Sequence, residues 1–130
     1  MKNNPYQAYR QQSVMTMTSG ELLIALYDGI LKQLHIAQSA FQRHDIAEIN
    51  HSLQKAQCMI GHLDSTLDDN YEISSNLHAL YDYFLNVICG ANLKKDPAGL
   101  EDVVEMIAEL RSTYMQADRL SRTEAAATAE

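Results

Sequence analysis

The sequence of 130 residues contains no tryptophan, only two prolines and only five glycines. Proline and glycine are the residues that helix interiors tolerate least, so their scarcity favours a helical fold. No apolar stretch approaches the ~20 residues that cross a bilayer, and residues 1–6 lack the apolar run of a signal peptide. Cys58 and Cys89 show no paired spacing, which is typical of reduced thiols in the cytoplasm. We therefore expect a soluble cytoplasmic protein.

Positive charge is also scarce. The sequence has 10 Lys and Arg residues and 17 Asp and Glu residues, so its net charge is −7. Binders of nucleic acid gain affinity by replacing counterions with basic side chains, and anionic membrane surfaces attract basic segments in the same way. We therefore expect neither nucleic acid nor a membrane as partner.

Apolar residues are abundant and regularly spaced. Four segments, at about 18–42, 45–67, 73–93 and 96–119, repeat them in alternating steps of three and four. This period is typical of helices that pack nearly antiparallel at about 20°, and short connections make neighbours antiparallel. The prediction is an all-α, up-down-up-down four-helix bundle over residues 18–120, with a flexible N-terminal arm at 1–17 and a disordered tail at 121–130.

Helix starts have their own signals. Thr18 and Asp45 are each followed three residues later by Glu, as in a capping box. Asp96 precedes Pro97, which suits an N-cap followed by the first helical position. In the third segment one stripe is assigned to the core, and the remaining apolar residues fall outside it. That core stripe is Ile73, Leu77, Leu80, Phe84, Val87 and Ala91.

Residues with chemical potential are few. Glu48 and His51 have the Glu-x-x-His spacing of di-metal bundles, but a second copy is missing, so no metal and no cofactor is expected. An exposed His on a bundle helix also fits a histidine phosphotransfer domain, and Lys55 follows one turn after His51. This alternative stays open beside a homodimerising helical adaptor with a self-complementary patch. The prediction is that the protein is not an enzyme.

Surplus apolar residues give the main functional signal. They flank the predicted core stripes on several helices, and part of them should widen the core. The rest would form a patch larger than monomer surfaces usually expose, which marks a binding site. The surplus residues are Leu22, Ile24, Leu26, Leu31, Ile36, Tyr81, Tyr83, Leu85, Ile88, Val104, Met106 and Met115.

Several short motifs, in order along the chain, are similar to those of the flagellar secretion chaperones called FliS. They are Asn4-Pro5-Tyr6-Gln7-Ala8-Tyr9, Val14-Met15-Thr16, Glu21-Leu22, Leu26-Tyr27-Asp28-Gly29, Leu80-Tyr81-Asp82-Tyr83, Ala91-Asn92, Lys95-Asp96 and Leu110-Arg111. The resemblance covers about residues 4–115. Ser19 replaces the usual proline at the start of the first helix, and it still suits a helix start. Tyr114 replaces the usual tryptophan of the fourth helix, and it is still an aromatic core residue.

The resemblance implies a function. Such chaperones bind the disordered C-terminal segment of flagellin in the cytoplasm, prevent premature polymerisation and help deliver flagellin to the type III export gate. It implies that client helices lie on apolar grooves and that the arm can cover part of that surface. The expected client-binding residues are Tyr6, Tyr9, Val14, Leu22, Leu26, Tyr27, Tyr81, Tyr83, Leu85, Ile88 and Asn92.

Overall fold

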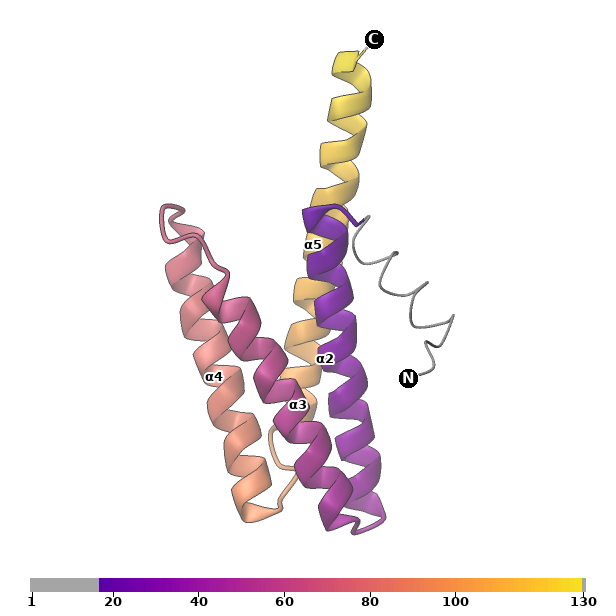
Figure 1. The fold of residues 1–130 in the computed structure, drawn as a ribbon, viewed down its shortest axis with the longest axis vertical. Coiled ribbons are helices and arrows are strands. Elements are labelled where there is room, and N and C mark those ends of the chain that lie inside the picture. The colour runs from indigo at the N-terminus through magenta and orange to yellow at the C-terminus, as the bar shows by residue number, and fades with distance from the viewer. Residues whose placement is uncertain (1–16, 130) are drawn as a thin grey trace, which may run out of the picture.

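The computed structural model describes residues 17–129, and the side chains of residues 17–125. These residues form helices α2 (Ser19–Gln42), α3 (Ile46–Ser65), α4 (Ile73–Lys94) and α5 (Leu100–Ala129). Successive helices run in opposite directions (Figure 1). The structure confirms the predicted all-α four-helix bundle. The expected arm, apart from Met17, lies outside the described residues.

Two of the three predicted helix starts are confirmed. The Thr18 hydroxyl accepts a hydrogen bond from the backbone N–H of Glu21 at 3.2 Å. The Asp45 carboxylate accepts one from the N–H of Glu48 at 3.1 Å. Each cap satisfies a donor that has no partner within its own helix.

The third predicted start is wrong. α5 begins at Leu100, because the Asp96 carboxylate accepts from the N–H of Ala98 at 3.0 Å and closes a turn instead of capping a helix. Gly99 follows with a φ of 88°, a conformation that favours glycine. The Asp-Pro pair therefore shapes the connection, and the helix starts after the glycine.

The end of α5 also differs from the expectation. The sequence predicted an end near Arg119 and a disordered tail from residue 121, whereas the helix continues to Ala129. Figure 1 shows this part projecting beyond the other helices. Ala, Arg and Glu are strong helix formers, and no Gly or Pro interrupts the segment. Local propensity thus continues the helix where the core-facing stripe has ended.

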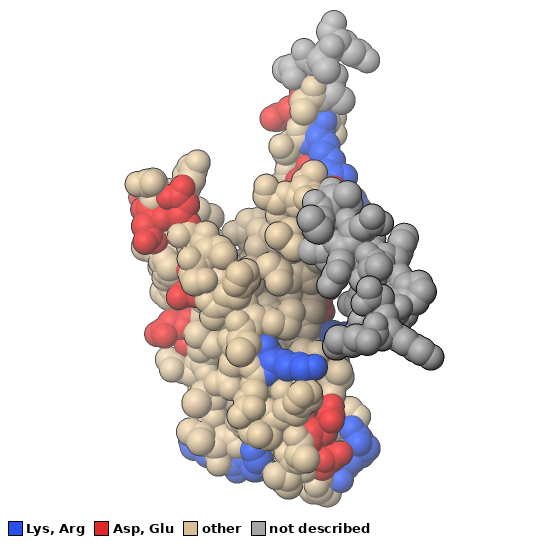
Figure 2. All heavy atoms as spheres, in the orientation of Figure 1, with Lys and Arg blue, Asp and Glu red and all other residues tan. Residues whose placement is uncertain are grey.

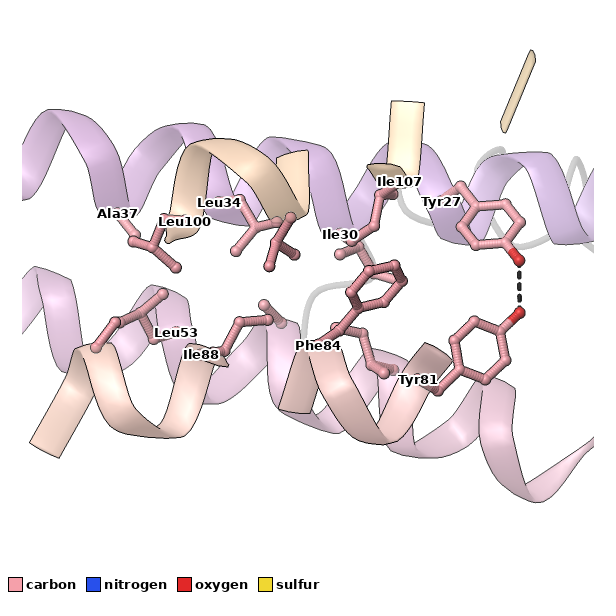
Figure 3. Packing of buried hydrophobic residues seen from close by; sticks show 14 of the residues in the cluster. Tyr27, Ile30, Leu34, Ala37, Leu53, Tyr81, Phe84, Ile88, Leu100 and Ile107 are labelled. Carbon is pink, nitrogen blue, oxygen red and sulfur yellow. Dashed lines mark hydrogen bonds between the residues drawn. The ribbon is translucent and has the colours of Figure 1, made fainter. Parts of the chain in front are cut away.

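The core runs along the bundle axis between the four helices (Figure 3). α2 and α3 pack together most extensively, whereas α4 and α5 have the smallest contact of the neighbouring pairs. The largest side chains of the core are Tyr27, Tyr81, Phe84, Ile30, Leu34, Ile49, Leu53, Ile60, Ile88, Leu100, Ile107 and Val103.

The assignment of the α4 stripe was partly wrong. Tyr81 and Ile88, placed outside the core by the sequence, are 2% and 0% exposed. Leu80 and Val87, placed inside it, are only partly buried. α4 packs more extensively on α3 than on α5, so its buried face is turned toward α3. Burial of Tyr81 and Ile88 reduces the apolar surplus that the sequence suggested.

Candidate binding site

A cleft lies at the end of the bundle where α2 begins and where α3 connects to α4. Its volume is about 390 Å³. Figure 2 shows the surface hollowed between the tip of the α3–α4 hairpin and the α2–α5 side, with uncharged residues over the hollow. We call it the open-end cleft. Its lining includes Leu22, Leu23, Leu26, Leu63, Leu67, Tyr71, Ile73, Leu77, Tyr81 and Tyr114.

Large apolar side chains stand exposed at the rim of this cleft. Leu22 on α2 is 40% exposed, Tyr71 in the α3–α4 connection 66%, and Ile73 at the start of α4 59%. Scattered exposed apolar residues are ordinary on monomers, but three around one apolar hollow are typical of a binding surface. The cleft can therefore receive apolar side chains from a partner.

Three aromatic residues from three helices meet beside and beneath the cleft, and we call Tyr27, Tyr81 and Tyr114 the tyrosine cluster. The hydroxyls of Tyr27 and Tyr81 share a hydrogen bond of 2.5 Å, drawn dashed in Figure 3. The rings of Tyr27 and Tyr114 stack, with centroids 5.7 Å apart and planes 22° apart. Burial raises the pKa of all three phenols above the ordinary value. They are therefore neutral hydrogen-bonding groups over the physiological pH range.

The α3–α4 connection, which forms one wall of the cleft, is held by polar contacts. The Ser74 hydroxyl donates to the carbonyl oxygen of Asp68 at 2.5 Å. The Asp68 carboxylate accepts from the N–H of Asn70 at 3.0 Å. These bonds are local and shape the turn at Asp68, and Leu67 and Tyr71 on either side of it line the cleft.

His78 on α4 adds a longer-range contact to the same wall. Its Nδ1 lies 2.5 Å from Asp64 Oδ1 at the end of α3, and its Nε2 lies 2.8 Å from Asp69 Oδ1 in the connection. Hydrogen bonds with Asp64, and then with Asp69, raise the pKa of the imidazole. We call these three residues the His78 bridge. It ties α3, the connection and α4 together, and its members are the chain neighbours of the cleft residues Leu63, Asp68 and Leu77.

Ion pairs join α2 to α5 on the other side of the cleft. Arg122 contacts Glu21 at 2.5 Å and Asp118 at 3.1 Å. Further along the two helices, Arg111 pairs with Asp28 through two of its nitrogens. Ion pairs at or near the surface contribute little free energy, so these contacts add little to the stability of the bundle.

The comparisons with known proteins cover almost the whole chain. The profile of the family described as "Flagellar protein FliS" matches residues 2–121. The chain belongs to this family. It is 40% identical over 119 residues to the flagellar secretion chaperone FliS of Bacillus subtilis, covering 92% of this chain and 90% of that one. It is 35% identical over 116 residues to the protein of that name from Vibrio cholerae, covering 85% of each.

A third relative extends the comparison to a more distant sequence. The flagellar secretion chaperone FliS of Salmonella typhimurium is 30% identical over 117 residues, covering 85% of this chain and 87% of that one. The resemblance inferred from the motifs is thus confirmed at family level. Among the residues that the structure describes, no helix is apolar over a length that could traverse a bilayer.

The structure brings together only part of the expected client-binding set. Leu22, Leu26 and Tyr81 all line the open-end cleft. Tyr27 is 1% exposed and contacts two residues of the cleft lining, Tyr81 and Tyr114, from the core side. The predicted residues of the arm lie outside the described part of the chain. Those are Tyr6, Tyr9 and Val14.

The other expected residues lie further along α4, away from the cleft. Tyr83 is 44% exposed, and Leu85 is half-buried. Ile88 is fully buried, so it cannot touch a partner in this conformation. Asn92 donates to the side-chain oxygen of Asn50 at 3.0 Å and so joins α4 to α3 near the opposite end of the bundle.

The residues considered for other chemistry lie on the outer surface. His51 is exposed on α3, with Lys55 beside it along one shallow hollow. Cys58 and Cys89 are free thiols, and both are exposed. Within the described residues, no group of three or more His, Cys, Asp and Glu side chains could hold a metal ion.

Sequence reasoning missed the His78 bridge. The partners of His78 are 14 and 9 residues away in the sequence, so helical spacing does not connect them. The acidic Asp68-Asp69 pair is visible in the sequence, but by itself it is typical only of a turn. What could not be foreseen is that the α3–α4 hairpin would place both carboxylates on one imidazole.

Proposed function

We propose that this chain is a flagellar secretion chaperone that binds the C-terminal segment of flagellin in the cytoplasm. It keeps the segment from polymerising and helps to deliver it to the type III export apparatus. The names of its relatives suggest the chaperone role. The observation that carries the binding proposal is the open-end cleft, because it is apolar, open to solvent and rimmed by exposed Leu22, Tyr71 and Ile73.

The geometry of the cleft favours a helical client segment. It lies among the ends of antiparallel helices, where another amphipathic helix can place residues of one face against it. A disordered segment loses ~2–5 kcal/mol when it orders on binding. Apolar burial returns ~25 cal/mol for each Å², so several anchors are needed. The cleft is the main site for such apolar anchors, and exposed Tyr83 and half-buried Leu85 offer further contacts along α4.

The binding test is calorimetry of the full chain with a flagellin C-terminal peptide. We expect one peptide per chaperone and a clearly negative heat-capacity change, which is the marker of apolar burial. Backbone chemical shifts should move for residues around the cleft. A titration without heat and without shift changes at those residues would contradict the proposal.

A pair of leucines gives a matched set of variants. Leu22→Asp places a charge at the cleft rim, where Leu22 is 40% exposed, and should weaken peptide binding by at least about tenfold. Leu93→Asp is the control, because Leu93 is 81% exposed near the far end of α4. Equal loss in both variants would show that the peptide does not use the cleft.

His51→Ala serves as the control for the phosphotransfer alternative. His51 is exposed on α3 and outside the cleft lining. The substitution should leave peptide affinity and flagellin secretion unchanged. Loss of flagellin secretion in cells that carry a stably folded His51→Ala protein would favour phosphotransfer instead.

A further inference from the structure

The His78 bridge requires a charged histidine. Both ring nitrogens face carboxylate oxygens, at 2.5 Å for Asp64 and 2.8 Å for Asp69. A neutral imidazole has one N–H and one bare nitrogen, so it can donate to only one carboxylate. The second contact would then set a lone pair against a carboxylate oxygen. Both hydrogen bonds exist together only in the imidazolium form.

The charged surroundings of His78 are acidic. Within the described part of the chain, the carboxylates of Asp64 from α3 and Asp69 from the connection contact its ring. On α4 itself, Asp82 follows one turn later. Asp68 and Glu72 are exposed in the same connection, and Figure 2 shows acidic side chains gathered at this tip. Without the imidazolium these carboxylates repel one another.

The bridge fastens a wall of the open-end cleft. Leu67 and Tyr71, which belong to the connection, line the cleft, and Asp69 lies between them in sequence. We infer that the His78 bridge is a pH-sensitive fastener of this wall. Protonated, it holds the connection against α3 and α4 and keeps the cleft formed. Deprotonated, it loses one hydrogen bond, and the connection with Leu67 and Tyr71 moves away from the cleft.

The direction of the pH response follows from the contacts. They favour the charged imidazole in the folded protein, so the bridge is intact at and below the ordinary histidine pKa of 6.5. It is lost as pH rises through the higher pKa of His78 in the folded state. The wall is therefore ordered at mildly acidic pH and loosens toward alkaline pH.

The test is a nuclear magnetic resonance titration of the full chain from about pH 6 to about pH 9, without any client. The imidazole of His78 should titrate above the ordinary histidine pKa of 6.5, because both of its ring nitrogens face carboxylates. The methyl signals of Leu67 should move with the midpoint of His78. Leu67 signals that stay constant while His78 titrates would overturn the inference.

Two variants separate the bridge from general effects of pH. His78→Gln should abolish the pH-dependent movement of Leu67, whereas His35→Gln should leave it intact. Asp69→Asn should lower the pKa of His78 without unfolding the bundle, because the Asp69 side chain is 82% exposed. A Leu67 response that persists in a folded His78→Gln protein would assign the pH effect to another group and reject the bridge.

A consequence for the client rests on the proposed function. If the ordered wall forms part of the client site, affinity for the flagellin peptide should fall severalfold between about pH 6 and about pH 9 in the native chain and not in His78→Gln. Absence of peptide binding at every pH would contradict the proposed function but leave the Leu67 result standing. If binding is equally strong at both pH values while the Leu67 signals still move with pH, the client does not use this wall.

Discussion

The hydroxyl pair of Tyr27 and Tyr81 allows a quantitative test of the core beside the cleft. The two side chains are 1% and 2% exposed, and their oxygens lie 2.5 Å apart. Substitution of either tyrosine by phenylalanine keeps the ring and removes only the hydroxyl. The remaining hydroxyl then has lost its partner in a buried place.

The expected costs follow from this geometry. A buried polar group left without a hydrogen bond costs ~1–3 kcal/mol. Tyr27→Phe and Tyr81→Phe should therefore each lower the free energy of unfolding by about that amount. The double variant removes both polar groups together and should lie within about 1 kcal/mol of the native protein. The two substitutions are thus expected to be strongly non-additive.

Urea unfolding followed by circular dichroism measures these differences, provided that the slope with denaturant stays constant. A double variant that loses as much as the sum of the two singles would refute the reasoning, because the hydroxyls would then act independently. Single variants whose free energy of unfolding hardly changes would show that water reaches the hydroxyl pair. The side of the pair that faces the cleft would then be more open than the 2% exposure of Tyr81 indicates.

Two further predictions concern the glycines and the response to alkali. A Cβ on Gly20 would lie 2.3 Å from Asp118 Oδ1, whereas one on Gly61 would meet nothing within 4 Å. Gly61→Ala should therefore raise the free energy of unfolding by about 0.5–1 kcal/mol, and Gly20→Ala should not. Urea unfolding measures both differences. Equal gains in the two variants would contradict the close approach of Asp118 to Gly20. The free energy of unfolding should also fall above about pH 10, the ordinary tyrosine value, because the unfolded chain releases the protons of the tyrosine cluster first. Calorimetric melting measures this fall, and the fall should be smaller when Tyr81 is replaced by Phe. A free energy of unfolding that does not change above about pH 10 would contradict the burial of the phenols.

The sequence was sufficient for the architecture because its signals are local. Apolar steps of three and four define helix faces, and a side-chain oxygen three residues before an acidic residue marks a helix start. Thr18 and Asp45 cap their helices as expected. Asp96 did not, because Gly99 allows a positive φ and the chain turns once more before α5.

The sequence was not sufficient for the orientation of α4. That helix carries two adjacent apolar stripes, one through Leu80 and Val87 and one through Tyr81 and Ile88. By periodicity alone, either stripe can face the core. The closer packing of α4 on α3 buries the stripe of Tyr81 and Ile88. The same limit applies to His78, whose carboxylate partners come from the fold of the hairpin and not from spacing.

The open-end cleft has the character of an unfinished core layer. Toward the other end of the bundle, α5 contributes Leu100 and Val103, both fully buried. Fully buried Ile107 follows, and nearer the cleft the core positions of α5 are partly buried Leu110 and Tyr114 and then exposed Ala117, whose side chain is small. Within residues 17–125, the apolar rim residues Leu22, Tyr71 and Ile73 stay exposed. A helical client with large apolar residues would cover them, so its binding should depend on the volume and apolarity of its anchors more than on their identity. Exchange of one large aliphatic anchor for another should then be tolerated, as it is in protein cores, whereas a charge at the same client position should abolish binding.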